Sequence, residues 1–214
     1  NKEDAILGVA VINPFCWPVR PSLWKWIKAV LIGKRKLQYD KMYFFSDSKE
    51  RRKNYKNYLT QLAQAIKTYT SEHNAFAVII GMEKLDAKPC SHFKEFLGQD
   101  CALVTSLDTP VFQMTSILHC LDILVTSRYH AAVLSMLKGM PIVAVSMDNR
   151  LDGLYQDIAQ HLHRVGDADL ANRIIRSLKE ADENKPRITE ATQIYVDKCR
   201  TTLREMAKIL SGKI

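Results

Sequence analysis

The chain has 214 residues, of which 47% are hydrophobic and 25% charged, a balance that suits an ordered globular core. Its formal net charge is +8, which favours anionic partners such as phosphorylated metabolites, nucleic acid or a lipid surface. No apolar run approaches the ~20 residues that a spanning helix needs, and five scattered cysteines without a CxxC pair argue against a disulfide framework and structural zinc. We therefore expect a soluble protein of the reducing cytoplasm.

The first predicted strand is residues 5–12, a nearly continuous apolar run typical of a buried parallel strand. Asn13 follows its carboxyl end and is a candidate substrate-binding residue. A helix is predicted from Ser22, as its cap, to Gly33, and its tryptophans are interpreted as packed aromatics, with a ligand-facing role as the alternative. Because residue 1 is not Met and no signal peptide precedes the first strand, we expect the chain to begin inside a longer protein that has another N-terminal domain.

The next stretch alternates helices and strands. A short aromatic run lies at 43–45, and apolar residues at threes and fours predict a long helix that follows it, from Lys49 to about Glu72. A second buried strand follows at 75–80, and we interpret Glu83 and Asp86, beyond its carboxyl end, as part of a solvated loop. The remaining elements before residue 120 are a helix at 91–97, a strand at 101–104 and a helix at 109–119.

The two densest basic clusters are Lys34-Arg35-Lys36 and Arg51-Arg52-Lys53. Neither belongs to a recognisable nucleic-acid motif, so we expect no nucleic-acid partner and interpret both clusters as solvated faces. The alternative is peripheral contact with an anionic membrane, which would place the protein at the inner face of that membrane.

Residues 122–150 carry the densest set of reactive side chains. A short apolar run at 123–125, a helical pattern at 129–138 that Gly139 ends, and a second apolar run at 142–145 predict a right-handed βαβ unit with buried parallel strands. The carboxyl ends of parallel strands meet at one edge of a sheet, and ligands bind beyond that edge. The candidate site is therefore placed just after these two strands.

The first strand of this unit is followed by Ser127, Arg128 and His130, and the second by Asp148 and Arg150. Guanidiniums bind carboxylates and phosphates, and an imidazole moves protons near neutral pH. These residue types therefore predict anion binding and proton transfer, with Arg128 and His130 side by side. The structural alternative is an ion pair between Arg128 and Asp148, with His130 as a helix cap.

The C-terminal part is predicted to be helical. A helix is expected at 151–163, another from Asp167 or Asp169 to about Ala181, and a last one at 189–211 that Thr189 caps. No GxGxxG, P-loop, GxSxG or HExxH motif is present, and His161 and His163 fall on different helix faces, so no metal site is expected. The alternation predicts one doubly wound, Rossmann-like α/β domain over residues 1–214.

At residues 126–150, TSRYHAAVLSMLKGMPIVAVSMDNR, the chain resembles the polysaccharide pyruvyl transferase family. The resemblance comprises Asp122 with its apolar run, Arg128-Tyr129-His130, Gly139-Met140-Pro141 and the loop 147–150. Tyr129 stands where Leu is commoner, and Arg150 where many members have Lys. Weaker similarity extends upstream through the strand at 75–80 and Asp86.

The resemblance implies the C-terminal half of a two-domain, GT-B-like enzyme of exopolysaccharide biosynthesis. Such an enzyme moves a pyruvyl group from phosphoenolpyruvate to a sugar of a cell-surface polysaccharide or its lipid-linked oligosaccharide precursor, without a further cofactor. It implies that Arg128 and Arg150 bind the donor's carboxylate and phosphate, with Ser127 and Asn13 as further binding residues. His130 would then transfer protons, and Asp148 would orient it or accept a proton from a sugar hydroxyl. In the resembled architecture part of the site belongs to the other domain, so we expect this chain alone to be catalytically poor.

Two other functions remain open. A nucleotide-sugar glycosyltransferase of the same architecture would need an acidic residue after a strand to hold the ribose diol, for which Asp148 and Asp152 are the candidates. A non-catalytic binding domain is the other alternative.

Overall fold

The computed structural model describes residues 5–17, 19–32, 43–158 and 161–212. The chain forms two compact units, one made of Asn1–Ile12 with Leu59–Ile214 and the other of Asn13–Tyr58. The predicted helix stop at Gly33 and the basic cluster Lys34-Arg35-Lys36 lie outside the described residues.

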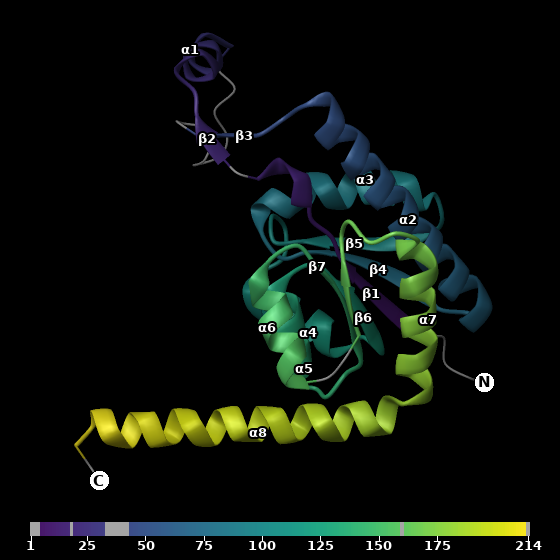
Figure 1. The fold of residues 1–214 in the computed structure, drawn as a ribbon, viewed down its shortest axis with the longest axis vertical. Coiled ribbons are helices and arrows are strands. Elements are labelled where there is room, and N and C mark those ends of the chain that lie inside the picture. The colour runs from purple at the N-terminus through teal and green to yellow at the C-terminus, as the bar shows by residue number, and fades with distance from the viewer. Residues whose placement is uncertain (1–4, 18, 33–42, 159–160, 213–214) are drawn as a thin grey trace. The chain divides into compact units, whose positions relative to one another are not determined.

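The first unit is built on a six-stranded parallel sheet with the strand order β5-β4-β1-β6-β7-β8 (Figure 1). Numbered along the sheet by chain order, this is the 3-2-1-4-5-6 order of Rossmann folds, so the predicted doubly wound α/β fold is confirmed. The strands are β1 (Ile6–Ala10), β4 (Phe76–Gly81), β5 (Cys101–Thr105), β6 (Ile123–Thr126), β7 (Ile142–Ser146) and β8 (Leu162–Arg164).

Helices cover both faces of this sheet, because the strands are apolar on both sides. On one face α4, α5 and α6 form a core with Ala10, Leu124 and Ala144, and α7 lies on the other side (Figure 1). The helices are α2 (Lys49–His73), α3 (Ala87–Leu97), α4 (Val111–His119), α5 (Tyr129–Met136), α6 (Asn149–Ile158), α7 (Leu170–Glu183) and α8 (Lys185–Leu210). The long helix predicted from Lys49 is thus confirmed.

The second unit has a different construction. Its strand β3 (Tyr43–Phe45) is the aromatic run, for which no strand is predicted from the sequence, and it pairs antiparallel with β2 (Val19–Pro21) in a separate two-stranded sheet. The single turn η1 (Pro14–Cys16) and the helix α1 (Leu23–Ile32) complete it together with the start of α2. Arg51 links the start of α2 to the segment around η1, because its Nη1 donates to the carbonyls of Phe15 and Trp17 at 2.7 and 2.5 Å.

Two predictions in the C-terminal part are wrong. The helix expected at 151–163 ends at Ile158, and Leu162–Arg164 forms the edge strand β8, which pairs with Ala144–Ser146 of β7. The last helix begins at Lys185, not at Thr189, whose hydroxyl donates instead to the carbonyl of Gly139 at 2.7 Å. In both places contacts with distant parts of the chain, which local sequence does not report, decide the element bounds.

His163 on β8 makes the stability of the fold depend on pH. The residue is 8% exposed, its Nε2 lies 2.9 Å from the Ser177 hydroxyl, and its buried Nδ1 has no hydrogen-bond partner among the described residues. Burial lowers the pKa of His163 to about 4, and the positive charge of Arg173 adds to the effect. The folded protein therefore keeps His163 neutral at pH values where the unfolded chain protonates it.

As the pH falls below about 6.5, the ordinary pKa of histidine, the unfolded state binds a proton that the folded state excludes. We expect the free energy of unfolding to decrease from about pH 6.5 to about pH 4 by up to ~3 kcal/mol through this residue. Urea unfolding of the wild type and of His163→Gln across this range measures it. The difference in the free energy of unfolding between the two proteins should change with pH. If the free energies of both proteins fell in parallel as the pH is lowered, groups other than His163 would cause the acid sensitivity.

Candidate functional site

The candidate site lies where the chain reverses its direction across the sheet. From β1 the chain proceeds to β4 and β5 on one side, and from β6 it proceeds to β7 and β8 on the other. In open α/β sheets the crevice at the carboxyl ends of two such strands is the usual ligand site. Ser127 and Arg128 directly follow β6 at this point, and the backbone N–H of Ser127 donates to the Ala10 carbonyl at 3.1 Å.

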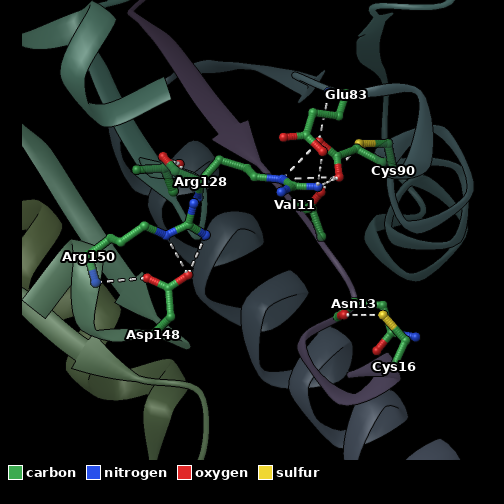
Figure 2. Close-up of polar contacts among 10 residues, drawn as sticks. Val11, Asn13, Cys16, Glu83, Cys90, Arg128, Asp148 and Arg150 are labelled. Atoms are coloured by element: carbon green, nitrogen blue, oxygen red, sulfur yellow. Dashed lines mark hydrogen bonds and ion pairs between the residues drawn. The ribbon is translucent and has the colours of Figure 1, made fainter. Parts of the chain in front are cut away.

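Arg128 is the N-cap residue of α5, and its backbone is held by Thr126. The Thr126 hydroxyl accepts from the Arg128 N–H at 2.9 Å and lies 3.1 Å from the Arg128 carbonyl, to which it donates. The Arg128 side chain crosses to residues that follow β4, where Nε donates to both Asp86 carboxylate oxygens at 3.1 and 3.0 Å and Nη2 donates to Asp86 Oδ1. Glu83 adds a second ion pair at 3.5 Å (Figure 2).

Asp86 is 1% exposed, so the expectation that it lies in a solvated loop is wrong. It ends the short 3-10 turn Lys84–Asp86 and accepts from the Glu83 N–H at 2.9 Å. Burial raises the pKa of Asp86, and its hydrogen bonds with Arg128 act against that shift. Burial, with the nearby charge of Asp86, also raises the pKa of the Cys90 thiol to about 12, which leaves that thiol protonated and unreactive.

The structural alternative, an ion pair between Arg128 and Asp148, names the wrong partner for Arg128. Arg128 does form a buried ion pair, but with Asp86 and not with Asp148. The hydrogen bonds described for Arg128 use Nε and Nη2, and none uses Nη1. The carboxylate thus fixes the plane of the guanidinium and leaves one nitrogen for a ligand.

Asp148 and Arg150 form the second charged pair, at the carboxyl end of β7 (Figure 2). Asp148 accepts from the Arg150 N–H at 3.0 Å and from Arg150 Nη2 at 2.6 Å. Burial would raise the pKa of Asp148, but hydrogen bonds from Arg150 and from the Leu151 backbone outweigh it and leave that pKa below its usual value. The hydrogen bond to Asp148 in turn raises the pKa of Arg150, and the negative charge of Glu83 contributes, so Glu83 acts on both guanidiniums.

His130 lies in the first turn of α5 and is exposed. Its ring packs edge-on to Tyr129, with centroids 5.9 Å apart and planes at 71°. Among the described residues no hydrogen bond joins His130 to Arg128 or Asp148, whereas Arg128 points towards Asp86. Both His130 and Arg128 therefore lie at the carboxyl edge, but the Arg128 side chain binds Asp86 whereas the His130 ring contacts Tyr129 and is exposed to solvent.

Asn13 is the first residue of the second unit. Its side-chain oxygen accepts from the Phe15 N–H at 3.0 Å and caps the turn η1, and the Cys16 thiol donates to its carbonyl at 3.0 Å (Figure 2). The described contacts of Asn13 are thus local to its own turn.

Two other residues of the family pattern, Asp122 and Gly139, make structural contacts at the opposite edge of the sheet. Asp122 accepts from the Ile6 N–H at 2.9 Å and pairs with Lys185 at 3.3 Å, which links β1, β6 and the start of α8. Gly139 has φ +68, and a Cβ there would lie 2.7 Å from Thr189, so only glycine fits this turn. Among the described residues no cluster of three or more His, Cys, Asp or Glu is arranged to hold a metal ion.

Comparison of the sequence with known families gives a match. The family model described as polysaccharide pyruvyl transferase matches residues 22–149, more than half of the chain. The chain belongs to the polysaccharide pyruvyl transferase family. The match contains Asp86, Arg128, His130 and Asp148 and ends one residue before Arg150.

No curated protein matches this pyruvyl transferase-like chain. In the part of the chain that the structure describes, no helix combines the length and apolar content needed to cross a bilayer.

Proposed function

We propose that this polysaccharide pyruvyl transferase-like domain transfers a pyruvyl group from phosphoenolpyruvate to a sugar of a cell-surface polysaccharide or its lipid-linked precursor. The observation that supports this most directly is that an oriented guanidinium, Arg128, and an exposed imidazole, His130, both follow β6 at the switch point of the sheet. The proposal includes the C-terminal half of a GT-B-like, two-domain enzyme in the cytoplasm that needs no further cofactor.

Donor binding falls to the two guanidiniums. Phosphoenolpyruvate presents a carboxylate and a phosphate, which planar guanidiniums bind with charge-assisted hydrogen bonds. Arg128 offers Nη1 while Asp86 keeps its orientation. The side chain of Arg150 is 63% exposed, so its pair with Asp148 resembles a surface ion pair that costs about 1 kcal/mol or less to open towards a phosphate.

Proton transfer falls to His130. Ketal formation adds a proton to the methylene carbon of the donor, joins two sugar hydroxyl oxygens to its central carbon, and releases phosphate. Two hydroxyl protons leave the sugar, one in balance with the new C–H bond and one carried away with the phosphate. An imidazole is suited to these transfers because it titrates near neutral pH, and Asp148 and Ser127 remain proposed polar contacts of the acceptor or donor.

The glycosyltransferase alternative has less support from the geometry. Its two candidate diol-binding carboxylates are both engaged by arginines, Asp148 by Arg150 and Asp152 by Arg164, each at 2.6 Å. A ribose diol would compete with the Arg150 guanidinium at Asp148, and the oxygen of Asp152 that has no partner among the described residues, Oδ1, is buried.

Thermal-shift titration of the full-length protein separates these functions. Phosphoenolpyruvate at about 100 times its Kd should stabilise the protein by ~2.7 kcal/mol, whereas UDP- and GDP-sugars should produce no shift. The Arg150→Lys variant should bind phosphoenolpyruvate nearly as tightly as the wild type does. The Glu83→Gln variant should bind it more tightly than the wild type, because the substitution removes a carboxylate that competes with the ligand for both guanidiniums. Stabilisation by a nucleotide sugar and not by phosphoenolpyruvate would reject the proposal, and no stabilisation by either would favour a binding domain.

A further inference from the structure

The second unit carries the whole net positive charge of the chain. Residues Asn13–Tyr58 contain twelve of the 31 Lys and Arg and three of the 23 Asp and Glu, which gives +9. The other residues hold nineteen of the former and twenty of the latter, which gives −1. A positive charge concentrated in one small unit attracts an anionic partner to that unit.

The same unit has a helix whose apolar side chains face outward. A helix on the surface of a globular protein normally buries an apolar stripe. In α1, LWKWIKAVLI, Trp24 is 83% exposed, Leu31 is 81% exposed and Leu23 is 73% exposed. Seven of its ten residues are exposed large hydrophobics, namely Leu23, Trp24, Trp26, Ile27, Val30, Leu31 and Ile32. Its sequence has two lysines and no acidic residue.

We propose that α1 lies in the interface of an anionic lipid bilayer and attaches the protein to it. A helix of ten residues is about 15 Å long, half the ~30 Å of a hydrocarbon core, so it suits an orientation in the plane of the surface. Tryptophan is favoured at the boundary between headgroups and acyl chains, and aliphatic side chains at neighbouring positions enter the acyl region. Exposed basic residues of the unit, among them Lys28 and Lys53, are attracted to anionic headgroups.

A bilayer fits this surface better than a macromolecule does. A protein partner would need an apolar groove and a matching acidic surface of its own, whereas an anionic bilayer presents both features everywhere. Nucleic acid would match the charge, but it offers no apolar phase for the exposed leucine, isoleucine and valine side chains of α1. The proposal does not rest on pyruvyl transfer, because neither the charge nor the exposure of α1 involves the candidate site.

Intrinsic fluorescence tests the proposal in the full-length protein without any substitution in the second unit. All three tryptophans of this chain, Trp17, Trp24 and Trp26, lie in the second unit. Vesicles of phosphatidylcholine with about 30% phosphatidylglycerol should shift the emission of these residues to shorter wavelength, and brominated acyl chains should quench it. Pure phosphatidylcholine vesicles should have a much smaller effect. Any tryptophans contributed by a longer protein are first replaced by phenylalanine.

Substitutions then assign the binding to α1. Trp24→Ser combined with Leu31→Ser removes two large apolar groups and should raise the lipid concentration for half-maximal binding at least ~10-fold. The matched control is Leu203→Ser with Leu210→Ser, two residues of α8 that are 64% and 85% exposed, and it should bind as the wild type does. Co-sedimentation with the same vesicles measures all three proteins, and circular dichroism verifies that each is folded.

Several results would overturn the proposal. These are absence of binding to the anionic vesicles, equal binding to neutral vesicles, equal weakening by the α8 control, and sedimentation with nucleic acid in place of lipid. An emission shift that appears without lipid as protein concentration rises would assign α1 to a contact between copies of the chain. If the α1 variant does not fold, quenching of the unmodified protein by brominated lipid decides, with absence of quenching counting against the proposal. Stabilisation by phosphoenolpyruvate is measured separately, so either proposal can fail alone.

Discussion

Replacement of Arg128 by methionine is expected to lower the free energy of unfolding by about 3–5 kcal/mol, because it leaves the buried Asp86 carboxylate without its countercharge. Replacement of Arg150 by methionine removes a guanidinium from an exposed pair and should cost about 1 kcal/mol or less. The two variants remove the same charge, but Arg128 and its partner Asp86 are both more buried than Arg150 and Asp148, and Arg128 also pairs with Glu83. Urea unfolding at pH 7 compares them.

A double variant provides the control for this prediction. In Arg128→Met with Asp86→Leu no buried charge remains unpaired, so it should be more stable than Arg128→Met alone. Equal losses from Arg128→Met and Arg150→Met would mean that Asp86 is hydrated in solution. The proposal that Asp86 holds the Arg128 guanidinium in a fixed orientation would then be wrong.

His130→Ala is expected to lower the rate of pyruvyl transfer by ~10²–10⁴-fold, the usual contribution of a general acid–base group, equivalent to about 3–5 kcal/mol of barrier. Binding of phosphoenolpyruvate should change little, because both guanidiniums remain. The fold should also be unaffected, since His130 is exposed and makes no hydrogen bond among the described residues. Single-turnover rates and calorimetric titration of the full-length enzyme measure the two effects separately.

His161→Gln is the matched control, because His161 is also accessible to solvent but pairs with Glu180 on α7. It should transfer pyruvyl groups at the wild-type rate. The assigned roles would be reversed if His130→Ala abolished donor binding while Arg128→Lys bound normally. Arg128→Lys is used for this comparison because it retains a charge opposite Asp86 but loses the planar donor set.

The residues of the chain alone predict the fold class and the edge of the sheet at which the candidate site lies. Continuous apolar runs at β1, β4, β6 and β7 are the mark of strands buried on both faces, and they depend only on local composition. Ser127, Arg128 and His130 follow one of these strands directly, so their place at the carboxyl edge needs no knowledge of distant contacts. The same holds for Asp148 and Arg150 after β7.

The partners of these side chains depend on which strands become neighbours. β4 and β6 both pair with β1, so their ends lie about 10 Å apart, a distance that the long side chain of Arg128 spans to reach Asp86. No local pattern joins residues 42 positions apart, and Asp86 after a strand end has the composition of an ordinary loop. The edge strand β8 was missed for a related reason, because His163 and its neighbours become a strand only through pairing with β7. Local composition therefore places the reactive groups, and the strand order determines which of them are neutralised and which remain available to a ligand.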